Sequence, residues 1–83
     1  MKIEVRYFAS VREVLGPRES VDVVDGATVG DLRDRLIALG GSHAEALARG
    51  RALRMALDQT LCDERAVLRP GAEVAFFPPV TGG

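Results

Sequence analysis

The chain has 83 residues, of which 47% are apolar and 28% charged, and eleven basic against twelve acidic residues give a net charge of −1. The two signs are interspersed, which excludes a surface that tracks nucleic-acid phosphates. A chain this short buries only about 60–65% of its unfolded surface, so we expect one domain without a deep enclosed pocket. A single cysteine excludes an internal disulfide. With no apolar N-terminal segment and no run near 20 apolar residues, the sequence predicts a protein of the reducing cytoplasm with no membrane span.

The first quarter of the chain predicts two paired strands. Residues 2–8 alternate between apolar and polar side chains, which is the period of a half-buried strand, and place Phe8 on the polar face. Residues 10–13 indicate a turn with a short helical piece. Residues 20–24 form a second predicted strand, antiparallel to the first, which Asp25-Gly26 closes.

The main helix is predicted to begin after Thr28, whose spacing to Asp31 is that of a capping box. Residues 33–35 are expected to face solvent, and Gly40-Gly41 ends the helix. The apolar residues that recur at helical spacing are Val29, Leu32, Leu36 and Leu39.

The remaining elements are a short helix and two more strands. Residues 42–45 repeat the capping pattern before a short helix that Gly50 ends. Residues 53–57 alternate as a third strand, followed by a turn at Asp58-Gln59, and residues 73–77 form the last strand. This order predicts a single-core α+β domain in which one amphipathic helix packs against one sheet.

The C-terminus combines a stiff joint with two glycines. Pro78 and Pro79 fix φ and lack N–H groups, so the last strand must stop there and continue in an extended, polyproline-like form. Residues 78–83 reach roughly 20 Å at about 3.3 Å each, far enough to enter another protein's active site. Gly82 and Gly83 place no Cβ near the terminal carboxylate. We therefore expect a domain over residues 1–77 and a projecting tail whose carboxylate reacts after ATP-dependent activation by a partner.

Three stretches of the chain resemble one family. Residues 73–83, with their Phe-Phe-Pro-Pro-Val-Thr-Gly-Gly ending, resemble the C-terminus of the small subunits of molybdopterin synthase, the MoaD family of ubiquitin-like sulfur carriers. Residues 5–13 are similar to that family's first strand and turn, and Gln59-Thr60-Leu61 lies at the expected distance before the last strand. The likeness spans the whole chain. It implies the β-grasp fold of ubiquitin, a mixed sheet on one main helix, with the last strand beside the first.

The resemblance also implies a carrier that is no enzyme by itself and binds no cofactor. A MoeB-like adenylyltransferase would adenylate the carboxylate of Gly83, which then becomes a thiocarboxylate, 1-thioglycine. The tail, including Val80 and Thr81, would insert into a large, MoaE-like subunit, in a heterotetramer of two small and two large subunits. There the sulfur converts cyclic pyranopterin monophosphate to molybdopterin for the molybdenum cofactor.

All four aromatic residues occur in two adjacent pairs, Tyr7-Phe8 and Phe76-Phe77. Neighbours on a strand point to opposite faces, so we predict that Phe8 and Phe77 form an exposed patch beside the root of the tail, which Leu61 extends. Single exposed apolar residues are common and need no function. A patch beside a reactive terminus is better explained as a docking surface for a partner.

Three further residues have competing interpretations. Arg12 matches an arginine of the family near the tail and is a candidate partner contact, or a solvated surface arginine. Cys62 offers a rival sulfur chemistry as a persulfide, but without a cationic neighbour in sequence it is more typical of a small apolar filler. His43 has no second His or Cys at ligand spacing, so we predict a surface residue and no metal site.

Three alternatives to a molybdopterin synthase carrier stay open. A sulfur carrier for thiazole synthesis shares the fold and the Gly-Gly end but would not be expected to carry Phe-Phe-Pro-Pro-Val-Thr. A ubiquitin-like modifier would join its terminus to lysines of other proteins. A plain adaptor domain would use no terminal chemistry at all.

Overall fold

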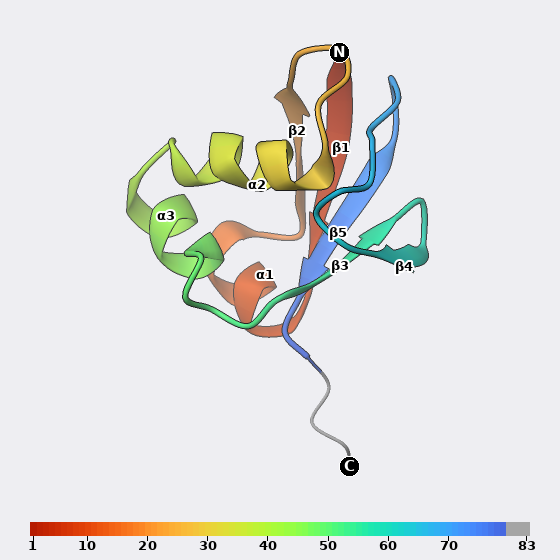
Figure 1. The fold of residues 1–83 in the computed structure, drawn as a ribbon. Coiled ribbons are helices and arrows are strands. Elements are labelled where there is room, and N and C mark those ends of the chain that lie inside the picture. Colours follow the sequence, from red (N-terminus) through yellow and green to blue (C-terminus); the bar gives the residue numbers. More distant parts are fainter. Residues whose placement is uncertain (80–83) are drawn as a thin grey trace.

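The computed structural model describes residues 1–79, and in them five strands and three helices. They follow in the order β1 (Lys2–Tyr7), α1 (Ala9–Leu15), β2 (Arg18–Asp22), α2 (Val29–Ile37), α3 (Gly41–Leu47), β3 (Arg54–Leu57), β4 (Thr60–Cys62) and β5 (Glu73–Phe77). The strands form one sheet in the order β2-β1-β5-β3-β4. The helices lie on one side of it and leave the other side open (Figure 1). The predicted α+β architecture is confirmed.

The first and last strands form the centre of the sheet. β1 and β5 run parallel, with Tyr7 opposite Phe76, while β2 and β3 flank them in antiparallel pairs. The rings of Tyr7 and Phe76 stack with centroids 6.4 Å apart. Stacking of two aromatic rings stabilises the fold beyond the effect of burying them, so this pair helps to fix the alignment of the two strands.

The core lies between the sheet and α2. Thr28 caps this helix as predicted, because its hydroxyl accepts from the Asp31 N–H at 3.1 Å and the Asp31 carboxylate accepts from the Thr28 N–H at 2.9 Å. Each reciprocal bond satisfies an amide that the helix leaves without a partner. The largest fully buried side chains are Tyr7, Phe76, Ile3, Leu32, Leu36, Leu47, Val5, Val29 and Val74.

Two predictions for the main helix were wrong. Arg33 is 3% exposed instead of facing solvent. Its guanidinium donates to the carbonyls of Leu47 and Ala48 at 2.8 and 2.7 Å and lies 3.5 Å from the Glu64 carboxylate. The helical period alone did not reveal that the end of α3 packs over this position. Leu39, predicted to be inward, is largely exposed because α2 ends at Ile37.

The neighbouring helix also differs from the prediction. α3 begins at Gly41 with Gly40 as N-cap, so Ser42 is not the cap. His43 is half-buried, and the prediction of a surface residue was wrong. Its Nε2 lies 2.7 Å from a carboxylate oxygen of Glu19, which also accepts the Tyr7 hydroxyl at 2.7 Å. Burial and this carboxylate raise the pKa of the Tyr7 hydroxyl well above its usual value. The contact ties α3 to the sheet.

The strands needed smaller corrections. β2 spans Arg18–Asp22, two residues earlier than predicted, and the polar stretch after Gln59 contains an unpredicted edge strand, β4. The turn at Asp58-Gln59 is confirmed. Both residues have positive φ, +48° and +69°, as a two-residue hairpin of the I′ type requires. The Asp58 carboxylate accepts the Glu73 N–H at 2.9 Å, which fastens the turn to β5.

Two leucines that the sequence placed on the same apolar face of the main helix test this description of the core. Leu36 is fully buried and Leu39 is largely exposed. We expect Leu36→Ala to lower the free energy of unfolding by about 2–5 kcal/mol, because it leaves a cavity. The control Leu39→Ala should change it by less than about 0.5 kcal/mol. Urea denaturation followed by circular dichroism measures both, and equal losses would contradict the core assigned here.

Candidate functional site

The candidate site is the end of the sheet from which the chain leaves the fold. β5 ends at Phe77, and the following Pro78 is half-buried while Pro79 is exposed. This end also carries α1 and the start of β3 (Figure 1). The division at residue 77 coincides with the end of the strand, and the separate roles of body and tail stay a prediction. Val80, Thr81, Gly82 and Gly83 lie outside the described residues, so their expected roles also stay predictions.

A row of cross-strand neighbours with two alanines at its centre crosses the open side of the sheet. Arg6 pairs with Ala75, Ala75 with Ala56, and Ala56 with Leu61, across four neighbouring strands. Ala75 and Ala56 are only 7% and 8% exposed, although neither is part of the core beneath the helices. Small side chains between longer ones form a floor, here with Arg6 on one flank and Leu61, 69% exposed, on the other.

The two predicted aromatic residues lie on the tail side of this alanine floor. Phe8 continues β1 in extended geometry, donates its N–H to the Phe76 carbonyl at 3.2 Å and is 38% exposed, opposite to buried Tyr7. Phe77 lies on the same face but is half-buried, less exposed than predicted. We call Phe8, Phe77 and Leu61 the docking patch. The structure places all three on the open face, and their role in binding stays a prediction.

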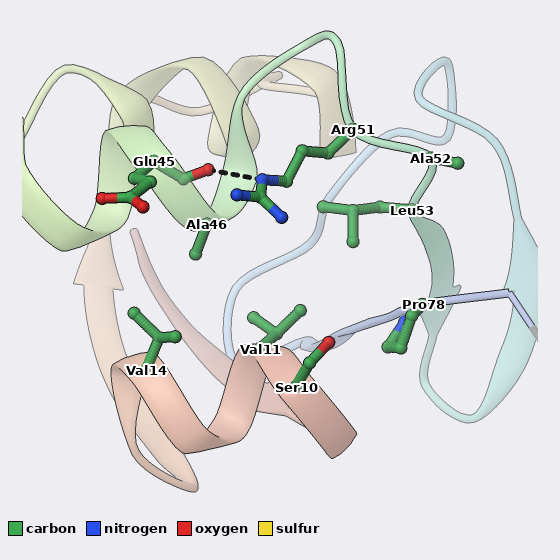
Figure 2. Close-up of a pocket in the computed structure, with 9 residues that line it drawn as sticks. All are labelled: Ser10, Val11, Val14, Glu45, Ala46, Arg51, Ala52, Leu53 and Pro78. Carbon is green, nitrogen blue, oxygen red and sulfur yellow. Dashed lines mark hydrogen bonds between the residues drawn. The ribbon is translucent and has the colours of Figure 1, made fainter.

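On the helix side, a cleft of about 310 Å³ opens beside the tail root (Figure 2). Its walls come from α1, α3, residues 51–53 and Pro78. The Arg51 guanidinium donates to the Glu45 carbonyl at 2.9 Å, which holds the arginine along one wall. Val11 and Val14 line the opposite wall. The tail therefore leaves the fold between this cleft and the docking patch.

The remaining candidates show little chemistry of their own. Arg12 is exposed on α1, and within residues 1–79 no carboxylate lies within 4.0 Å of its guanidinium. Cys62 is half-buried on β4, opposite Met55. Burial, and then the charge of Asp63, raise the pKa of its thiol. Since the thiolate is the reactive form, Cys62 is poorly suited to carry sulfur.

The described part of the chain carries neither a metal-binding cluster nor a membrane-spanning helix. Among residues 1–79 there is no group of three or more His, Cys, Asp and Glu side chains placed to hold a metal ion. No helix in that part of the chain is both long and apolar enough to cross a bilayer.

A comparison with family models decides the assignment, because the model of the ThiS family matches residues 5–83. The chain belongs to the ThiS family. The sulfur carrier subunit of molybdopterin synthase from Escherichia coli is 44% identical over 81 residues, which cover 98% of this chain and 99% of that protein. The resemblance to the small subunits of molybdopterin synthase is thereby confirmed.

Solved structures agree on the fold. The crystal structure of small archaeal modifier protein 1 from Haloferax volcanii matches with a TM-score of 0.76 and 31% identity, covering 95% of this chain and 98% of that one. Subunits 1 and 2 of the molybdopterin-converting factor from Helicobacter pylori form a complex whose matching chain has a TM-score of 0.70 and 26% identity, with both chains covered completely. The β-grasp expectation is confirmed, and the chain is similar both to a carrier subunit and to a modifier.

Sequence reasoning missed the alanine floor on the open face. The alternation in residues 73–77 already put Ala75 outward, and the alternation in residues 53–57 separated Ala56 from its apolar neighbours. The sequence did not show that Ala56 on β3 pairs with Ala75 on β5. The signal was therefore present in each strand, and only the register joins the two residues.

The environment of Cys62 predicts a slow thiol. We expect iodoacetamide at neutral pH to alkylate Cys62 several times more slowly in the folded protein than in guanidinium, because a raised pKa and partial burial both reduce attack by the thiolate. Mass spectrometry of the intact chain follows the reaction. Alkylation in the folded state at the unfolded rate would show that the thiol is accessible and ionised.

Proposed function

We propose that the protein is the sulfur carrier subunit of a molybdopterin synthase, and that Gly83 carries the sulfur. The observation that carries this proposal is the match to the Escherichia coli carrier subunit over almost the full length of both chains. The position of the tail root, between the docking patch and a cleft, supports it. A body of this size recognises partners, and the tail presents the reactive group to them.

Activation of the terminal carboxylate comes first. A carboxylate is a poor electrophile, so an ATP-dependent, MoeB-like adenylyltransferase forms the acyl adenylate at Gly83 and releases pyrophosphate. A sulfur nucleophile then displaces AMP and leaves the thiocarboxylate, 1-thioglycine. The absence of a Cβ at Gly82 and Gly83 leaves both faces of the carbonyl open to attack. This chain supplies an unhindered acyl group, and the partners supply the catalysis.

Sulfur transfer follows in the large, MoaE-like subunit. The docking patch binds the body to that subunit. Pro78 and Pro79 direct the tail into the subunit's active site, and Val80 and Thr81 lie along the path that the tail takes. The acceptor is cyclic pyranopterin monophosphate, which becomes molybdopterin for the molybdenum cofactor. The pterin takes two sulfurs, so the carrier is released and reloaded, in a heterotetramer of two small and two large subunits located in the cytoplasm.

A protein modifier is the second candidate, favoured by the similarity to small archaeal modifier protein 1. A modifier forms an isopeptide bond between its terminus and a lysine, whereas a carrier exchanges one oxygen of Gly83 for sulfur. Intact mass spectrometry of the protein from cells separates the two. A form heavier by the difference between sulfur and oxygen supports the carrier, and high-mass conjugates with no thiocarboxylate would overturn it.

Removal of Gly83 tests the tail chemistry. We expect the deletion to abolish thiocarboxylate formation and sulfur transfer while the melting temperature stays unchanged, because a projecting tail buries little surface. Mass spectrometry after incubation with the activating enzyme, ATP and a sulfur source measures loading, and calorimetry measures stability. A loaded deletion variant, or one that unfolds, would contradict the proposal. Cys62→Ala is the control, and it should load fully.

A charged residue introduced into the docking patch tests whether the patch binds the large subunit. We expect Phe77→Asp to weaken binding to the large subunit by roughly 5–30-fold, equivalent to about 1–2 kcal/mol, because aromatic anchors dominate such interfaces. Val24→Asp is the matched control, since Val24 is an exposed apolar residue away from the patch. Isothermal titration calorimetry measures both variants. Equal affinities for Phe77→Asp and the wild type would remove the patch from the interface.

A further inference from the structure

Three arginines surround the tail half of the open face. Arg18 on β2 lies directly opposite Arg6 on β1, and Arg54 on β3 lies directly opposite Phe77 on β5. The Arg6 guanidinium carbon is 5.6 Å from the centroid of the Phe8 ring. We call Arg6, Arg18 and Arg54 the arginine rim, since they flank the docking patch and the alanine floor.

The rim is poorly neutralised by the described part of this chain. Within residues 1–79, the carboxylate nearest to it is that of Glu73, 3.9 Å from Arg6 Nη1, and none lies within 4.0 Å of Arg18 or Arg54. Arg6 Nε is buried without a hydrogen-bond partner. Arg6 and Arg18 also face one another across antiparallel strands, where like charges are destabilising.

Two acidic groups near this face are already engaged. Glu4 accepts the Ser20 hydroxyl at 2.9 Å, two residue pairs further from the tail than Arg6 and Arg18. Asp63, which follows β4, accepts both the backbone N–H and the guanidinium of Arg65, at 2.8 and 3.0 Å. The fold thus keeps several cations together beside an apolar surface and compensates for little of their repulsion. An external anion would relieve it.

We propose that the arginine rim pairs with carboxylates on the large synthase subunit, arranged around the apolar pocket that receives Phe8 and Phe77. This inference rests on the proposed function and adds the chemistry of the partner's surface. An arginine fork fits a carboxylate in two parallel hydrogen bonds and is weakly hydrated, so it suits an interface that loses water. The chain's net charge of −1 and the apolar residues between the arginines favour a protein over a nucleic acid.

Charges at the edge of an interface mainly change the rate at which the two partners associate. They steer the partners toward one another and give an on-rate that falls as salt increases. The patch between the arginines then supplies the apolar contact. The rim should therefore control how fast and in which orientation the carrier docks, and salt should weaken its effect.

The test reverses two charges of the rim and compares them with two reversed elsewhere. Arg18→Glu/Arg54→Glu and the control Arg35→Glu/Arg69→Glu change the net charge equally. Arg35 lies on α2 and Arg69 precedes β5 at the end away from the tail, and both are exposed. Surface plasmon resonance with the large subunit measures on-rates at about 50 mM and about 500 mM sodium chloride. Circular dichroism confirms that each variant is folded.

We expect the rim variant to associate at least about tenfold more slowly than the control at low salt, with the difference shrinking at high salt. Arg18→Lys/Arg54→Lys, which keeps the charges, should retain most of the on-rate. Equal on-rates for the rim variant and the control would overturn the inference while leaving the proposed function intact. A wild-type protein that neither binds the large subunit nor accepts sulfur would overturn the proposed function, and the inference with it.

Discussion

The parallel pairing of β1 with β5 is the constraint on which the rest of the structure depends. It places the first and last strands of the described chain side by side in the sheet and sets Tyr7 against Phe76 beneath the helices. The same register puts Arg6 beside Ala75 on the opposite face, and Phe8 and Phe77 each follow one residue after the Tyr7–Phe76 pair. A slip of one residue would exchange the faces, so one alignment fixes the core, the docking patch and the exit of the tail.

A second constraint holds the helical layer over this sheet. Burial lowers the pKa of the Arg33 guanidinium, and the nearby Glu64 carboxylate opposes that shift. Arg49 also binds Glu64 and reaches the Gly30 carbonyl at 3.2 Å. A Cβ at Gly30 would come within 3.0–3.2 Å of Glu64 atoms, so the glycine permits this approach. The network joins α2, the end of α3 and the segment before β5, and thereby supports α3 as one wall of the cleft beside Pro78.

Local patterns in the sequence predicted the parts of the fold that depend on near neighbours. The alternation of residues 2–8 and the capping pair at Thr28 depend on contacts within a few residues, and the structure reproduces both. Arg33 and His43 were placed wrongly because their partners, the end of α3 and Glu19, are 14 to 24 residues away. The arginine rim escaped notice for the same reason, since its members gather only through the pairing of strands distant in sequence.

The arrangement separates recognition from reaction. Phe77, Leu61 and the arginine rim lie on strands of one sheet and Phe8 directly follows β1, so the proposed recognition would need no rearrangement of the body. The proposed reactive atom lies beyond a joint whose two prolines lack N–H groups and cannot extend the ladder of β5. Under the proposed function, modest contacts on the body would allow release while the tail reaches the partner's active site. A carrier that dissociates after each sulfur, as proposed, would need this combination of a weakly bound body and a reaching tail.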